Sequence, residues 1–201
     1  MGLDLFTFMF NVICKIKIRS RNVTNKLTII RNNAKLQESL ENVCDFILST
    51  TELKTSDYLF NVNTNCFIFA TDGAGNSFSF LNENNENSPI LYVCHEGSYG
   101  IVANNLTEFL SLIVSHPYYW QDILNMNRYN KLGSETVNIS LLEQDIKQDI
   151  PNLNEIQISI CNELQINYNP QQYKLMLESV SKYHDYKVYD IRSNSEYERL
   201  L

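Results

Sequence analysis

The sequence is poor in the residues that mark fibrous, low-complexity or disulfide-stabilised chains. Its 201 residues include only six glycines and four prolines, which excludes a collagen-like or Pro/Gly-rich disordered chain. The cysteines are odd in number, widely spaced and without a CxxC pair, which argues against a disulfide framework. Each lies in an apolar run, so we expect reduced core residues and a cytoplasmic, reducing compartment. These residues are Cys14, Cys44, Cys66, Cys94 and Cys161.

The apolar runs near the amino terminus are too short to cross a bilayer. The run from Leu5 to Cys14 is interrupted by Asn11, is preceded by Asp4 instead of a base, and is not followed by a small-residue cleavage site. Phe6 stands where a myristoylation motif needs Ser or Thr. We expect this segment to pack on the domain, with contact to an anionic membrane surface as the alternative.

Histidine is scarce, and its spacing matches no common metal motif. His95, His116 and His184 form neither HxxxH nor HExxH, and no cysteine pair has zinc spacing. The segment from Asp72 to Asn76 contains two glycines but lacks GxGxxG, GxxxxGK[ST] and the carboxylates of an EF-hand. We therefore expect neither a metal nor a cofactor.

Candidates for catalysis are few. Cys94 is followed by His95, which suggests a thiol hydrolase. Adjacent residues of a strand point to opposite faces, however, so the base would have to be His116 or His184. The acids near the predicted strand ends do not select a catalytic pair either. We expect no catalytic residue and no enzyme, with a hydrolase of dispersed site residues as the least favoured hypothesis.

Positive charge is scarce outside the first 35 residues. The formal net charge is −7, but residues 1–35 carry seven bases and one acid, which leaves nine bases and 22 acids, a charge of −13, in residues 36–201. A body of this charge repels phosphate backbones and attracts basic molecules at a distance. The composition thus predicts a protein partner and disfavours nucleic acid.

The hydrophobic periodicity of the first part predicts helices around a β-rich centre. It predicts a helix over 36–48, capped by Asn32 or Asn33, and another over 105–115, capped by Asn104 or Asn105, that ends before Pro117. Between them we expect an antiparallel meander of strands, with one buried face on the strand at 77–80 and a break at 96–100. The other predicted strands cover 58–62, 66–70 and 90–94.

The sequence pattern of the last third predicts mostly helices. A connector over 118–140 precedes predicted helices, the last of which begins with Asn169 as N-cap and Pro170 at its first position. A short strand over 186–191 and a loose tail from 196 follow. The predicted helices cover 141–150, 152–165 and 170–183. We predict an α+β fold, an antiparallel central sheet packed by helices, divided into a basic segment 1–35, a core 36–135 and a mainly helical extension 136–201.

The order of these signals resembles the SUKH superfamily, which includes cell-wall-assembly-regulator-like and bacterial immunity proteins. From Phe67 to Phe78 a strand ends in a small residue, passes through an Asp-Gly-x-Gly-Asn turn and enters an aromatic strand, as in the family's central signature. Pro89 opens the next strand, and residues 103–110 are similar to the family's closing helix with its Phe-Leu pair. The resemblance covers residues 36–115. The family's Leu-Pro entry and early Trp are not visible here.

The resemblance implies an antiparallel sheet packed by helices and no catalytic residues. For many bacterial members it implies an immunity protein that neutralises a toxin, often a nuclease, by direct binding, whereas eukaryotic relatives act as regulatory interaction proteins. The matching positions Asp72, Gly73, Gly75 and Phe109 would be structural. We therefore expect an immunity-type protein with a basic toxin domain as partner, and a regulatory or structural adaptor as the alternative.

Two groups of residues are candidates for the partner surface. Acids at strand ends could form a rim for a basic protein. An aromatic cluster directly after a helix is typical of a binding hot spot or, equally, of a lid on the core. The residues in question are Glu83, Glu86, Glu96, Tyr118, Tyr119 and Trp120.

Overall fold

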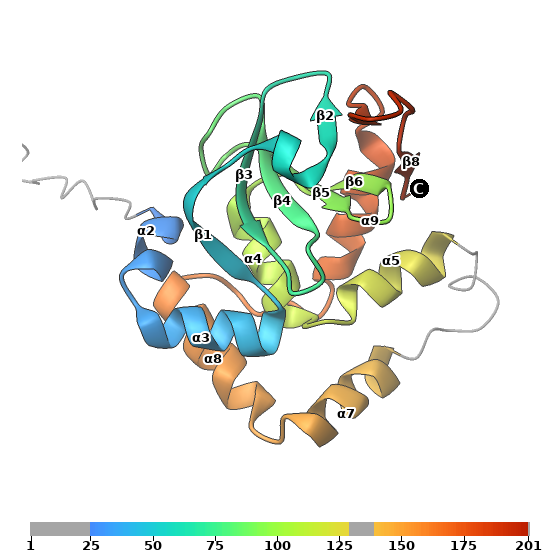
Figure 1. Ribbon diagram of the computed structural model, residues 1–201. Coiled ribbons are helices and arrows are strands. Elements are labelled where there is room, and N and C mark those ends of the chain that lie inside the picture. Colours follow the sequence, from blue (N-terminus) through green and yellow to red (C-terminus); the bar gives the residue numbers. More distant parts are fainter. Residues whose placement is uncertain (1–24, 129–138, 201) are drawn as a thin grey trace, which may run out of the picture.

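The computed structural model describes residues 25–128 and 139–200. A six-stranded, mostly antiparallel sheet is covered on one face by helices and on the other by a two-stranded sheet and the C-terminal segment (Figure 1). The predicted α+β class, with a mainly helical C-terminal part, is confirmed.

The large sheet has the strand order β1-β3-β4-β5-β6-β8. Its consecutive neighbours pair antiparallel, except that β8 pairs parallel with β6. The small sheet pairs β2 with β7. The strands are β1 Ile47–Leu53, β2 Phe60–Val62, β3 Cys66–Thr71, β4 Ser77–Leu81, β5 Ile90–Cys94, β6 Ser98–Ala103, β7 Val188–Asp190 and β8 Glu198–Arg199.

The helices start at the expected caps in two cases. The Asn33 side chain accepts a hydrogen bond from Leu36 N, and that of Asn105 accepts one from Glu108 N, which satisfies free N–H groups at each start. The helices are α2 Lys26–Arg31, α3 Ala34–Cys44, α4 Leu106–Ser115, α5 Trp120–Arg128, α7 Ile139–Asp149, α8 Leu153–Leu164 and α9 Gln172–Lys182, with a 3-10 turn, η1, at Thr55–Tyr58.

The first predicted helix ends four residues earlier than expected. Asp45 adopts the left-handed conformation (φ 50°, ψ 46°) and terminates α3, after which Phe46 turns into the core. Ile47 and Leu48, assigned to the helix by their spacing, instead begin the edge strand β1. Helical and strand spacing cannot be distinguished over two apolar residues, so the sequence did not reveal this strand.

The predicted break at 96–100 is also wrong. Ser98, Tyr99 and Gly100 lie in β6, and only residues 95–97 form the turn. A Cβ at Gly100 would lie 3.2 Å from a Leu200 methyl and 3.3 Å from a Val180 methyl, so this glycine marks close packing in a strand and not a turn. The strand predicted at 58–62 is shorter, and it pairs with β7 instead of joining the meander.

The predicted loose tail is likewise ordered. Glu198 N donates to Gly97 O at 2.8 Å and Leu200 N donates to Tyr99 O at 2.9 Å, so the tail pairs with β6. The Leu200 side chain is buried in the main core. Short strands that pair across about a hundred residues leave no local sequence signal.

The last helix begins two residues later than predicted. Gln171 is the residue before the first turn, and the Asn169 side chain accepts from Gln171 N at 3.0 Å, outside the helix. Asn169 N in turn donates to the buried Ser115 hydroxyl at 2.9 Å. Asn169 therefore anchors the loop to α4 and does not cap α9.

Strand β4 is buried on both faces, although its alternation predicted one. Phe78 and Phe80 face the helices, whereas Ser77 and Ser79 face a second core beneath β2 and β7. Neither serine hydroxyl has a hydrogen-bond partner among the described residues. In the sequence, the serines of the second face follow the alternation expected of a solvent-exposed face, so the pattern predicted only one buried face.

The described part of the basic segment belongs to the core. Leu27 and Ile30 of α2 are buried with residues of α3 and α8. Residues 1–24, with the apolar run and Cys14, lie outside the described residues, as does part of the connector, 129–138. Within the described ranges, none of the helices combines the length and apolarity needed to cross a membrane.

Candidate functional site

The turn between β3 and β4 is organised around one buried carboxylate. Asp72 Oδ1 accepts from Ala74 N at 3.1 Å and from Asn76 N at 2.9 Å, and Oδ2 accepts from Asn76 Nδ2 at 2.7 Å. Gly75 has a φ of 86°, which L side chains rarely adopt. The Asp-Gly-x-Gly-Asn sequence thus encodes a self-bonded turn.

The same turn lies against the end of α3. Gly73 N donates to Asp45 Oδ1 at 2.9 Å, and a Cβ at Gly73 would lie 3.0 Å from that oxygen. Glycine here permits the contact between turn and helix end. Beneath the sheet, Phe109 is fully buried against Phe46, Phe69 and Phe78, at centroid separations of 6.0, 6.2 and 4.8 Å.

Asn76 links this turn to the turn after β5. Its Oδ1 accepts from His95 N at 2.9 Å and lies 2.8 Å from His95 Nδ1. Residues 72–76 and 95–97 therefore form one unit at one end of the sheet, which we call the signature end. Figure 1 shows this end of β3 and β4 close to the end of α3 and the start of α5.

A cavity of about 440 Å³ lies at the signature end on the helical face, between the two turns and α5. Asn76 and Tyr92 form part of its wall, and both are buried. Glu96 and Asn125 lie where it meets solvent, and Gln121 lines it from α5. Gln121 Nε2 approaches Asp72 Oδ2 at 3.4 Å, which connects α5 to the turn. We call this space the α5 cavity.

Acidic groups lie near the wall of the α5 cavity. Burial raises the pKa of Tyr92 well above its usual range, and Cys94, Asp72 and Glu96 raise it further because they oppose a second negative charge. Among the described residues that line the cavity there is no Lys or Arg. Glu96 is exposed and has no hydrogen bond or ion pair to the rest of the described chain.

A second cavity, of about 320 Å³, opens at the same end on the opposite face of the sheet. Ser77 and Val93 form its floor, while Tyr58, Tyr197 and Arg192 surround it. Arg192 is paired with Asp190 at 2.9 Å, so its charge is compensated. The bridge between Asn76 and His95 separates the two cavities.

The predicted acidic residues do not lie together. Glu96 is at the signature end, whereas Glu83 and Glu86 lie in the loop between β4 and β5, at the opposite end of these strands. Glu86 Oε1 accepts from Leu27 N at 3.1 Å, and Glu83 Oε2 accepts from Asn85 Nδ2 at 2.7 Å. Both loop carboxylates therefore organise local backbone or side chains, while Glu96 projects into solvent.

The three residues of the predicted aromatic cluster differ in solvent exposure. Tyr119 and Trp120 are 3% and 2% exposed, and Trp120 packs edge-on against Tyr92 at 5.1 Å. These two residues fit the lid interpretation. Tyr118 is 40% exposed, has a φ of 59°, and donates from its hydroxyl to Asn42 O at 2.9 Å. It thus lies at the surface beside α3, and its role in binding stays a prediction.

The described residues contain no arrangement typical of thiol catalysis or metal binding. His95 Nδ1 is turned to Asn76, His116 is buried against Tyr119 and Tyr173, and Arg199 contacts His184 Nδ1 at 3.3 Å. None of these contacts involves Cys94. In the described part of the chain, no group of three or more His, Cys, Asp or Glu residues could hold a metal ion.

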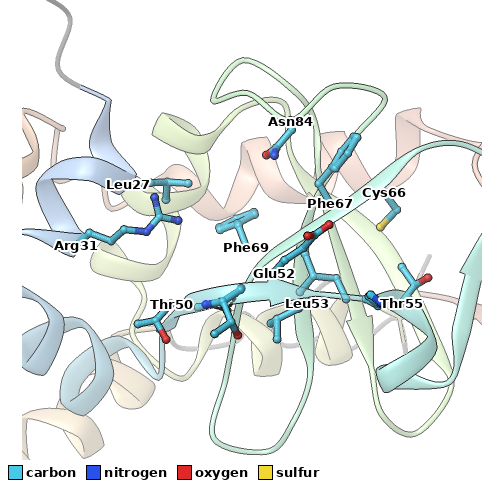
Figure 2. A pocket seen from close by; sticks show the side chains of 14 residues that line it. Leu27, Arg31, Thr50, Glu52, Leu53, Thr55, Cys66, Phe67, Phe69 and Asn84 are labelled. Atoms are coloured by element: carbon cyan, nitrogen blue, oxygen red, sulfur yellow. Dashed lines mark hydrogen bonds between the residues drawn. The ribbon is translucent and has the colours of Figure 1, made fainter.

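A third cavity lies elsewhere, at the edge of the sheet. Between Leu48 and Leu53, β1 departs from regular pairing with β3 and leaves a space of about 580 Å³ beside α2. Figure 2 shows Leu27 and Arg31 of α2 on one side of it and Phe67 of β3 on the other. Its walls mix hydroxyls with charges of both signs, so it does not select one ligand class.

His116 should make stability fall in acid. It is 1% exposed, its Nε2 has no partner among the described residues, and burial lowers its pKa to about 4 against a weaker opposing effect of Glu143. Below pH 6.5, His116 binds a proton in the unfolded chain but not in the folded chain. The free energy of unfolding therefore falls as the pH is lowered to about 4, by a total that approaches about 3 kcal/mol.

Urea unfolding at pH 7.5, 5.5 and 4.5 measures this effect. His116→Phe should reduce the pH dependence in this window, because the buried imidazole with the lowered pKa is removed. His184→Gln, at an exposed position, should unfold with the wild-type pH dependence. An equal pH dependence in His116→Phe and wild type would contradict the assignment.

Two residues of the site were not identified from the sequence. Asn76 was assigned only to a turn, and Gln121 only to a connector. The signal for Asn76 was its place at the end of the Asp-Gly-x-Gly motif, where a side chain can reach the next turn. Gln121 offered no signal, because α5 is placed beside Asp72 only by the tertiary fold.

Comparison with known proteins agrees with the motif. No curated protein and no solved structure matches the chain. The family model SUKH_6, described as SMI1-KNR4 cell-wall, matches residues 7–110 and so begins within the basic segment, earlier than the motif resemblance. The match spans more than half of the 201 residues and includes the signature turn and Phe109. The chain therefore belongs to the SUKH_6 family of the SMI1-KNR4 group.

Proposed function

We propose that the protein is a non-catalytic binding module of the immunity type, which neutralises a basic toxin domain by direct contact. The observation that carries this proposal is the charge of −13 on residues 36–201 in a member of the SUKH_6 family. A nuclease toxin must be basic to hold its substrate, and an acidic protein can occupy the same surface. Long-range attraction then accelerates the encounter.

The signature end is the face that best suits such a partner. It combines Glu96, which makes no ion pair with the described residues, the α5 cavity and the exposed Tyr118 beside Asp45. The opposite end uses Glu83 and Glu86 for internal hydrogen bonds. Hydrogen bonds of Asp72 and Asn76 hold the turns of the signature end in one conformation. Because these turns are already ordered, they lose little conformational entropy when a partner binds, which favours affinity.

The proposal predicts association that depends strongly on salt. Purified chain should capture a basic protein, encoded beside it in the genome, and protect cells that express that protein. The association rate should fall at least about tenfold between 50 and 500 mM NaCl, because the attraction is screened. Stopped-flow or surface plasmon resonance measures the rate. Absence of both a toxin-like neighbour and a basic captured protein would refute the proposal.

The alternative, a regulatory or structural adaptor, rests on the basic amino-terminal segment. Lys15, Lys17, Arg19 and Arg21 lie within residues 1–24, in contrast with the acidic remainder. Truncation separates the two functions: an adaptor should lose its location in the cell, whereas an immunity protein should still neutralise its toxin. The deletion must stop at residue 24, because α2 supplies Leu27 and Ile30 to the core.

A further inference from the structure

The α5 cavity has the size and polarity of a site for one side chain. Its volume of about 440 Å³ far exceeds that of a water molecule. The buried Tyr92 side chain lines one wall, the Asn76 amide lies in the same lining, and Glu96 lies at the rim with no hydrogen bond or ion pair to the described chain. An aromatic side chain and a carboxylate together suit a guanidinium or ammonium group.

The adjoining cavity, on the opposite face of the sheet, also contains a polar group without a partner in the described chain. Ser77 is 1% exposed, and its hydroxyl, at the floor of that cavity, has no hydrogen-bond partner among the described residues. Buried hydroxyls without partners are uncommon because each costs free energy. Ser77 in the adjoining cavity and Glu96 at the rim of the α5 cavity are thus two polar side chains at the same end of the sheet without a hydrogen-bond partner in the described chain.

We propose that the α5 cavity receives an arginine or lysine side chain of the partner protein, with its cationic group against Glu96 and its stem along Tyr92. This inference rests on the proposed function for the identity of the partner, but not for the chemistry of the site. Because the described lining contains no Lys or Arg, a cation entering it displaces no ion pair among these residues.

A titration with small probes tests the site without the partner. The full chain is titrated with N-acetyl-arginine methylamide, N-acetyl-lysine methylamide and the uncharged isostere N-acetyl-citrulline methylamide, and amide signals are followed by NMR. The cationic probes should shift the side-chain amides of Asn76 and Gln121 and the backbone of His95. Citrulline should bind at least about tenfold more weakly, since it lacks the charge.

Three variants complete the test. Glu96→Gln should weaken the arginine probe about tenfold, and Asn125→Tyr, at an exposed position on α5, should obstruct the cavity sterically without changing its charge. Glu83→Gln removes a carboxylate at the other end of the strands and should bind as wild type. Equal binding of citrulline and arginine, or wild-type binding by Glu96→Gln or Asn125→Tyr, would overturn the proposal.

Failure of this inference can be told from failure of the proposed function. If the chain neutralises a toxin and Glu96→Gln does so with unchanged affinity, the cavity proposal is wrong and the function stands. If no toxin is bound, the function is wrong whatever the probes show.

Discussion

Replacing Phe109 by alanine should lower the free energy of unfolding by about 3–5 kcal/mol. The ring is fully buried and contacts Phe46, Phe69 and Phe78, which come from the turn after α3 and from strands β3 and β4. Alanine removes the contact area and leaves a cavity that three rigid rings cannot fill. Urea or thermal unfolding of the purified variant measures the loss.

Phe67 provides the matched control for this change. It is also a phenylalanine of the region that the family model matches. Its side chain is 36% exposed at the cavity beside β1 and α2, and it is not one of the rings that contact Phe109. Phe67→Ala should cost less than half as much as Phe109→Ala. Equal losses would mean that the aromatic cluster does not carry the stability of the sheet and helix layers.

Replacing Asp72 by alanine should cost about 3 kcal/mol and disrupt the signature end. Its carboxylate accepts from two backbone N–H groups and from the Asn76 amide, and a hydrogen bond to a charged group contributes a net of about 1.5–3 kcal/mol. Without the carboxylate, Asn76 is no longer held toward His95. We therefore expect shifted NMR signals in residues 95–97 as well as reduced stability.

A second aspartate, exposed at the surface, provides the control that separates the loss of hydrogen bonds at Asp72 from the loss of a negative charge. Asp149 is exposed in the last turn of α7, where a negative charge opposes the helix dipole, so Asp149→Ala should be neutral or slightly stabilising. Asp72→Asn should lie between wild type and alanine, since one oxygen still accepts. A wild-type stability of Asp72→Ala would show that Gly73 and Gly75 alone specify the turn.

The predictions that held were those with a local cause. Asn33 and Asn105 cap their helices because a short side chain can bond a backbone N–H three residues ahead. The Asp-Gly-x-Gly-Asn segment forms a turn between β3 and β4 because its bonds lie within five residues. The family resemblance rested on the same segment and was confirmed over residues 7–110.

The predictions that failed depended on distant residues. Gly100 was taken as a break, yet it packs against Leu200 and Val180 inside a strand. The tail was taken as loose, yet Leu200 pairs with Tyr99, far away in the sequence. Apolar spacing placed Ile47 in a helix because the left-handed turn at Asp45 is not visible in the pattern.

The sequence by itself determined the α+β class, the family, the signature turn and the excess of acid after residue 35, since each depends on composition or on neighbours within a few residues. Only the tertiary structure decided which acids lie at the signature end and which lie at the opposite end of the strands. It brought Glu96, Asn76 and Gln121 around one cavity and placed Glu83 and Glu86 at the other end of the strands. The physical reason is that strand pairing and helix packing fix these distances through contacts between residues far apart in the chain.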